Sequence, residues 1–200
     1  MAVSGRGPGR RPGTSDTRGA ILAAARTSFA DKGFERTTMR GVASAAGVAP
    51  GLVHHFFGAK DDLFLAALAV PFDPRRMLAP AVDGPRSRLG ERLARTVLHT
   101  WEDEVRRESL VAFLRAAMTS PEVAAVLRTG MPVIALGVLR EVVTGPDAAV
   151  RVELAFSQLV GVALVRYVLA VEPVASLPVD ELVVRLAPVL QQHLLGARRG

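Results

Sequence analysis

The amino-acid sequence predicts an all-α protein of about nine helices. Apolar residues recur at spacings of three and four along most of the 200 residues, and no alternating apolar–polar stretch is long enough to predict a strand. Proline and glycine interrupt this pattern and mark the ends of the expected helices. The sequence predicts three parts: a flexible basic tail at 1–15, a first helical domain at 16–70, and a second at 71–200.

The first domain is expected to begin with a helix over residues 16–32. Ile21, Ala25 and Phe29 fall on its buried side, and Gly33 supplies the left-handed residue that ends it. The role expected for this helix is to support the residues that follow.

A helix-turn-helix is predicted over residues 38–57. Thr38 is placed to cap a first short helix, and Gly47 interrupts that helix. Pro50 stands where a second helix should begin, because its fixed φ suits the first helical turn. Two short helices joined by a tight glycine turn are a unit that inserts its second helix into the DNA major groove. A helical hairpin inside an ordinary all-α core is the alternative interpretation.

The exposed positions of this unit are the candidate DNA contacts. They are Thr38, Arg40, Pro50, Gly51, Leu52, His54 and His55. Thr38 and Arg40 are expected at a phosphate, and the small residues at the start of the second helix let its backbone approach the bases. Either histidine can donate to a phosphate or accept from a base edge. A shared metal ion is not expected, because adjacent residues on a helix point about 100° apart.

The charge distribution favours a polyanionic partner. Residues 1–60 hold nine basic and three acidic residues, whereas residues 61–200 hold sixteen of each. The net charge of +6 therefore lies on the segment that contains the predicted helix-turn-helix. Arginines in and just after the tail, Arg6, Arg10, Arg11 and Arg18, either follow the DNA backbone or enter a minor groove, or they belong to a disordered leader and touch nothing specific; the sequence leaves both open.

Two segments resemble the DNA-binding domain of the tetracycline-repressor (TetR) family of bacterial regulators: ILAAARTSFADKGFERTT at 21–38 and GVASAAGVAPGLVHHFFGAKDDLF at 41–64. The motifs that carry the resemblance are the Thr cap, AAGV and F-x-x-K, although the family usually has a tyrosine where His54 stands. The resemblance implies that Lys60 binds a backbone phosphate and that the helix from about 60 to 70 links the two domains. It also implies a bacterial, cytoplasmic regulator that binds an operator as a homodimer, most often a repressor released by a small molecule.

Proline density predicts a loop-rich link after this helix. Four prolines and a glycine fall between residues 71 and 85, which is too many for a long helix. Helices are then expected over about 86–106 and from Leu110 to Met118, with a further helix starting at Ser120-Pro121 and broken by Gly130 to Pro132.

The last third predicts two long apolar helices, from about 146 to 171 and from about 178 to 195. Their apolar surface is wider than one stripe, which is typical of helices covered by a partner chain. In the TetR-like interpretation these helices form a four-helix bundle with their copies. The candidate interface residues are Leu159, Val162, Ala163, Leu186 and Leu190. Burial within a single chain is the alternative.

A ligand pocket in the second domain is a further hypothesis. Its candidate lining residues are Trp101, Phe113, Met118, Phe156 and Gln158. Concave, mostly apolar sites with a few polar groups are typical of small-molecule pockets, but the same residues are also typical of an ordinary core.

Other function classes find less support in the sequence. The sequence contains no cysteine, no H-x-x-x-H, no glycine-rich phosphate loop and no G-x-S-x-G motif. We therefore do not expect an enzyme, a metal site or a bound cofactor. No run reaches the roughly 18 uninterrupted apolar residues of a membrane span. An architectural DNA-binding protein without effector control remains an alternative, although it would not need so large an apolar second half.

Overall fold

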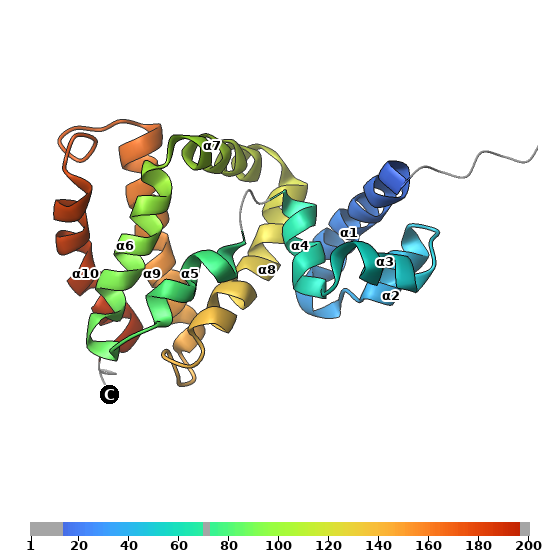
Figure 1. Cartoon of the computed structure of the whole chain (residues 1–200), viewed down its shortest axis with the longest axis horizontal. Helices are drawn as coiled ribbons and strands as arrows, with labels where there is room; N and C mark the ends of the chain where they lie inside the picture. Colours follow the sequence, from blue (N-terminus) through green and yellow to red (C-terminus); the bar gives the residue numbers. More distant parts are fainter. Residues whose placement is uncertain (1–13, 70–72, 197–200) are drawn as a thin grey trace, which may run out of the picture.

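The computed structural model describes residues 14–69 and 73–196 and is all-α within them, as predicted. Ten α-helices, rather than about nine, follow one another in these residues (Figure 1). The first four are α1 (Thr14–Arg36), α2 (Met39–Ala45), α3 (Pro50–Phe57) and α4 (Lys60–Leu68). The others are α5 (Pro74–Val82), α6 (Leu89–Glu102), α7 (Glu104–Thr119), α8 (Pro121–Leu139), α9 (Ala148–Ala163) and α10 (Val179–Leu195). A 3-10 turn (Arg86–Arg88) precedes α6, and a π-helical turn (Leu164–Val168) extends α9.

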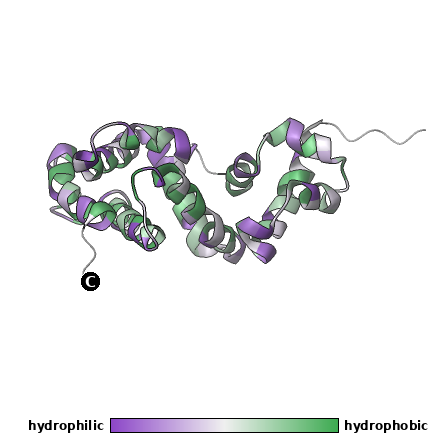
Figure 2. Ribbon diagram, turned by 90° about the horizontal axis from the view of Figure 1, so that it is seen from below, coloured by the Kyte–Doolittle hydropathy of each residue, from purple (hydrophilic) through white to green (hydrophobic). Residues whose placement is uncertain are grey.

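The buried residues form two hydrophobic clusters, one on each side of the molecule in Figure 1. Apolar and hydrophilic residues alternate along the helices of both parts (Figure 2), as expected for helices that bury one side. The N-terminal cluster is centred on three aromatic rings, with Phe64 edge-on to both Phe29 and Phe34 at 5.2 Å between ring centroids. The C-terminal cluster is built mainly by α6, α9 and α10.

Helix α8 contributes to both clusters, which corrects one prediction. Gly130 to Pro132 was expected to break this helix, yet it continues from Pro121 to Leu139. Val126 and Ile134 are buried in the N-terminal cluster, and Leu139 is buried in the C-terminal one. Proline removes one helical hydrogen bond, but packing along the helix outweighs that local preference. The predicted domain boundary falls at residues 70–72, outside the described residues, and α8 joins the two parts across it.

The segment expected to be a loop-rich link also contains a helix. In α5, Pro74 occupies the first turn, and the Asp73 carboxylate accepts a hydrogen bond from the Arg75 backbone N–H at 3.0 Å. Leu78 and Ala81 are fully buried against the C-terminal cluster. Proline at the start of a short helix is compatible with its geometry. The proline density excluded only a long helix here, and α5 has nine residues.

The residues proposed for a dimer interface need correction. Leu159, Ala163, Leu186 and Leu190 are buried inside the chain itself, where α10 packs on α6 and α9; Val162 is half-buried. The four buried side chains form the chain's own core and are not available to a partner, whereas Val162 stays a candidate. The large exposed apolar residues of the same helices are Val150, Leu154, Val160, Val184 and Val189.

Two stretches are long and apolar enough to cross a membrane by length and composition alone. They are Pro121–Leu139 and Ala148–Val168, each with a mean hydropathy of 1.6 over its most apolar window. Core helices have the same composition, and α8 packs against both clusters. We therefore attribute the apolar character of α8 to its place between the two cores.

Candidate nucleic-acid interface

The end of α1 and the start of α2 form a rigid corner. The helix breaks at Gly33, whose φ of 76° is favourable for glycine, and Phe34 returns into the core. Thr37, missed in the sequence analysis, is buried, and its hydroxyl lies 2.8 Å from the Gly33 carbonyl oxygen and 3.0 Å from that of Ser28. This corner sets the direction in which α2 leaves α1.

Helix α2 begins as predicted. The Thr38 hydroxyl accepts a hydrogen bond from the Gly41 backbone N–H at 3.0 Å, which confirms the N-cap. Because the hydroxyl is engaged in this cap, the predicted phosphate contact of Thr38 would have to share its oxygen. Arg40, in the first turn, is exposed.

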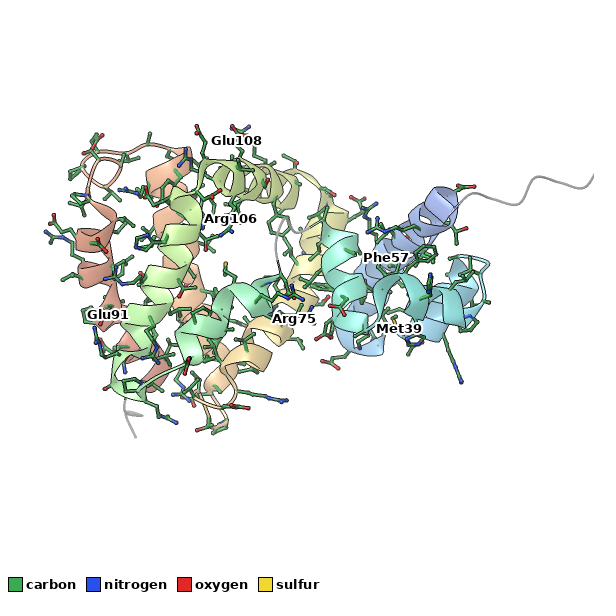
Figure 3. The ribbon with its side chains drawn as sticks, viewed as in Figure 1. Met39, Phe57, Arg75, Glu91, Arg106 and Glu108 are labelled. Carbon is green, nitrogen blue, oxygen red and sulfur yellow. The ribbon has the colours of Figure 1, made fainter. Side chains whose placement is uncertain are left out.

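Helix α3 presents its N-terminal end to solvent and buries its opposite side. Gly47 turns the chain with φ 66°, and Pro50 is the first residue of α3, as predicted. Val53 and Phe57 are buried, whereas Pro50 and Gly51 are exposed and Leu52 is 39% exposed. Phe57 appears with Met39 among the side chains of this part in Figure 3.

The two histidines of α3 are in different environments. His54 Nδ1 lies 3.0 Å from the carbonyl oxygen of Gly58, the residue after the helix. A carbonyl oxygen only accepts, so Nδ1 carries the proton and the Nε2 of a neutral ring is left as an acceptor. The Nε2 of a neutral His54 can therefore accept a hydrogen bond from a base edge or from a donor that is itself bound to a phosphate. A hydrogen bond to a phosphate oxygen requires a proton on Nε2 as well, that is, the protonated ring. His55 is exposed and its ring lies edge-on to Phe56.

Lys60 ties the start of α4 to the end of α1. Its Nζ donates to the Phe34 carbonyl oxygen at 3.0 Å and to the Glu35 carbonyl oxygen at 3.3 Å, and lies 4.4 Å from the centre of the Phe34 ring. An ammonium group has three N–H donors, so one is left for another acceptor. The predicted phosphate contact of Lys60 stays a prediction for that donor.

Arg18, which the sequence offered with the arginines of the tail as a DNA contact, lies in α1. Its guanidinium lies 5.3 Å from the centre of the Phe57 ring, on the exposed side of α1. Cation–π stacking of this kind fixes the direction of a long side chain. Only its position inside a basic segment singled it out in the sequence. The arginines at 6, 10 and 11 lie outside the described residues.

The side chains predicted to line a ligand pocket are not brought together. Trp101 and Phe156 belong to the C-terminal cluster, whereas Phe113 packs against the N-terminal one. Met118 and Gln158 are exposed. Helical spacing identifies an apolar face but not the helix that it meets, which is why this set was wrong as a single site.

Trp101 instead takes part in a polar cluster at the end of α6. Its ring stacks on Tyr167 at 5.5 Å between centroids, and the Tyr167 hydroxyl donates to Glu102 Oε1 at 2.7 Å. Arg166 donates to the same carboxylate oxygen and to two carbonyls of the loop before α10. Burial and the bond to Glu102 raise the pKa of Tyr167 to about 12. Burial opposes ionisation of Glu102, but the bonds from Tyr167 and Arg166 outweigh it and hold its pKa below the ordinary value.

A cavity of about 350 Å³ lies elsewhere, where α4, α5 and α8 meet. Its wall includes Val133, Ile134 and Val138, together with the charged residues Asp61, Arg75 and Arg140. In Figure 3, Arg75 lies at this junction. No group of three or more metal-ligating side chains occurs among residues 14–69 and 73–196.

Two family models match the chain. The model of the N-terminal part, bacterial regulatory proteins of the tetR family, matches residues 21–67, which contain α2 and α3. The model of the tetracyclin repressor-like C-terminal domain matches residues 87–194. The matches therefore cover both hydrophobic clusters.

Curated relatives match over about a quarter of the chain. The transcriptional repressor AcnR of Corynebacterium glutamicum is 42% identical over 52 residues, or 26% of this chain and 28% of that protein. The transcriptional regulator BetI of Rhizobium meliloti is 41% identical over 51 residues, or 26% of this chain and 25% of that protein. The chain thus spans about a quarter of the length of either relative.

One solved structure matches over nearly its whole length. A TetR-family regulator from Streptomyces coelicolor A3 is 37% identical, over 94% of this chain and 99% of that one, with a TM-score of 0.44. The family model of the C-terminal domain covers more than half of the 200 residues, which leads to one conclusion. The chain belongs to the tetR family of bacterial regulatory proteins.

Proposed function

We propose that this protein is a transcriptional regulator that reads double-stranded DNA with α3. The observation that carries the proposal is the division of α3 between a buried side and an open N-terminal end. Val53 and Phe57 anchor the helix, and Pro50, Gly51 and Leu52 stand exposed at its start. An added Cβ at Gly51 would meet nothing within 4 Å, so this end is free to enter a groove. Arg40 of α2 and Lys60 of α4 add positive charge to the same domain.

The regulator acts as a homodimer on an inverted-repeat operator. Val150, Leu154 and Val160 of α9 leave apolar side chains exposed, and so do Val184 and Val189 of α10. Exposed apolar residues on adjacent helices support a second copy of the chain as their cover. A two-fold dimer presents two copies of α3, and these require two half-sites about one helical turn apart.

The regulator is a repressor released by a small molecule, and it works in the cytoplasm. Helix α8 supports such coupling because it packs into both hydrophobic clusters, so a shift in the C-terminal part moves side chains of the DNA-reading part. By thermodynamic linkage, the operator and the small molecule weaken each other's binding by the same factor.

An architectural DNA-binding protein without effector control is the second candidate. The concentration of positive charge in residues 1–60 would serve it equally well. Membership in a family of regulatory proteins favours the regulator over this candidate and over an enzyme.

Selection of bound sequences from random duplex DNA at near-physiological salt tests the proposal. An enriched inverted repeat is expected from a dimeric reader. Binding that fades uniformly with rising salt, without any enriched sequence, would support the architectural candidate. No binding even at low salt would refute DNA reading by this chain.

A variant pair tests whether α3 is the reading element. Gly51→Trp places a bulky side chain at the start of α3, where it should abolish operator binding and leave the melting temperature unchanged. Ala112→Trp, at an exposed position of α7, is the matched control and should bind as the unmodified protein does. Unchanged binding by Gly51→Trp would exclude this end of α3 from the groove.

A further inference from the structure

The junction between the two parts contains an ion-pair cluster centred on Arg75. From the first turn of α5, its Nε bonds to Asp73 at 2.9 Å and its Nη2 to Asp62 of α4. Its Nη1 lies 4.0 Å from Asp61, also of α4. The bond to Asp62 is thus a direct polar link from a helix of the C-terminal part to the first turn of α4.

Asp62 connects this link to the C-terminal end of α3. Asp62 also accepts a hydrogen bond from the Ala59 backbone N–H at 3.3 Å. Ala59 directly follows Gly58, whose carbonyl oxygen holds His54 of α3. A change in the position of the Asp62 carboxylate therefore acts on the short connection between α3 and α4.

The cavity beside this cluster combines an apolar wall with the guanidinium groups of Arg75 and Arg140. Val133, Ile134 and Val138 of α8 form the apolar side, and an added Cβ at Gly137 would meet nothing within 4 Å. Arg75 already faces the carboxylates of Asp61, Asp62 and Asp73, whereas Arg140 adds a second guanidinium group to the lining. The Arg140 guanidinium is exposed and forms no hydrogen bond or ion pair with residues 14–69 or 73–196, so its charge is available.

Size and composition indicate the class of ligand. About 350 Å³ lies within the range of small-molecule sites, which run from about 300 to 1,000 Å³. The apolar wall suits a short hydrocarbon chain. Guanidinium groups bind carboxylates in a planar, bidentate arrangement, and a carboxylate on the ligand would replace Asp62 as a partner of Arg75.

We propose that this junction cavity binds an amphipathic carboxylate, which pairs with Arg140 and takes Arg75 from Asp62. The proposal rests on the proposed function for its biological meaning, because the bound carboxylate is the small molecule that releases the operator. Loss of the Arg75–Asp62 bond frees the first turn of α4, and the α3–α4 connection no longer holds α3 in its reading position.

Calorimetric titration tests the site without any DNA. Hexanoate is the probe, with hexanamide and hexylammonium as neutral and cationic controls of equal chain length. We expect one saturable hexanoate site per chain, with hexanamide weaker by about tenfold or more, the usual cost of losing a charge-assisted hydrogen bond. No hexanoate binding, or tighter binding of either control, would overturn the proposal.

Variants locate the site. Gly137→Phe fills the cavity and should abolish hexanoate binding, while Gly137→Ala should retain it. Arg140→Gln should weaken binding about tenfold, and Arg128→Gln, at an exposed position of the same helix, should not. Unchanged binding by Gly137→Phe would place the hexanoate elsewhere and refute this cavity.

Fluorescence anisotropy with a labelled operator duplex tests the release mechanism. Hexanoate should lower operator affinity, and Asp62→Asn, which keeps an acceptor for Ala59 and loses the charge, should do so without hexanoate. Added hexanoate should then change the affinity of Asp62→Asn less than that of the unmodified protein. Hexanoate binding without any effect on the operator would overturn the mechanism. If no duplex is bound under any condition, the proposed function fails, and calorimetry still decides on the cavity.

Discussion

Gly130 of α8 packs directly against Phe64 of α4, and its substitution should be costly. A Cβ built there would lie 2.1 Å from Cζ and 2.2 Å from Cε2 of Phe64. The Phe64 ring is fully buried and held edge-on between Phe29 and Phe34. It cannot turn aside without disturbing both rings, so α8 has to move away from α4 instead.

The net effect of Gly130→Ala is a difference between two opposing contributions. Alanine in place of glycine inside a helix stabilises by roughly 1 kcal/mol, whereas overpacking a core costs about 1 to 3 kcal/mol. Because the contact lies far inside van der Waals distance, we expect the upper part of that range and a net loss of about 1 to 2 kcal/mol. For a chain of this length the melting temperature falls by about 2 to 4 °C per kcal/mol.

Gly137→Ala is the matched control on the same helix. A Cβ at Gly137 meets nothing within 4 Å, so only the helix preference should act and the protein should gain up to about 1 kcal/mol. Urea denaturation at one fixed protein concentration measures both variants, since an oligomer would make stability depend on concentration. The double variant Gly130→Ala/Phe64→Leu should recover part of the loss, because leucine withdraws the ring atoms. Equal stability of the two alanine variants would refute the close packing of α8 on α4.

Further predictions concern the reader and the polar cluster of α6. Lys60→Ala should lower the salt dependence of DNA binding by about one unit of slope and also reduce the melting temperature, because its bonds to the end of α1 are lost; an unchanged slope would remove Lys60 from the phosphate contacts. Thr38→Ala should cost about 1 kcal/mol in urea denaturation through loss of the N-cap, and no loss would mean that the cap contributes nothing. Because the pKa of Glu102 is lowered in the folded state, its contribution is present above the ordinary value of 4.5 and is lost as the pH falls below it. Glu102→Gln should therefore be less stable at neutral pH and lose less stability on acidification, as thermal melts across this pH range would show; a variant with an unchanged pH profile would contradict the role of its bonds from Tyr167 and Arg166.

The helix-turn-helix was predictable because its determinants are local. Thr38 caps α2 through a bond to Gly41, only three residues away, and Pro50 starts α3 through its own fixed φ. Gly47 takes a positive φ that few other residues adopt readily. Each of these effects operates within one or two helical turns, so the residue types and their order are sufficient to predict them.

The errors have a common origin in contacts between distant segments. Gly130 and Pro132 are poor helix residues taken alone. Nevertheless, α8 is held in place by packing against five other helices, α1, α4, α5, α7 and α9. Likewise, α5 is stabilised by burying Leu78 and Ala81 against α6. Local preferences of a few kcal/mol give way when such surfaces are buried.

The same limit applies to the candidate sites. The exposed start of α3 was identified correctly as a solvent-facing end, because small residues there adjoin a clear apolar stripe. For α9 and α10 the apolar surface was recognised, but spacing could not tell which residues, such as Leu159 and Leu190, face α6 in the same chain. The junction cavity was not predicted at all, since Arg75 and Arg140 are 65 positions apart and only the packing of α5 on α8 makes them neighbours.

Helix positions, caps, the glycine turn and the basic character of residues 1–60 thus follow from the order of the amino acids, because they depend on interactions within a few residues or on composition. The course of α8 through two cores, the inward side of α9 and α10, and the Arg75 cluster depend on which surfaces meet in three dimensions. Those pairings are chosen by burial of apolar area and by complementary charge between segments far apart in the chain. They belong to the folded molecule and cannot be assigned one segment at a time.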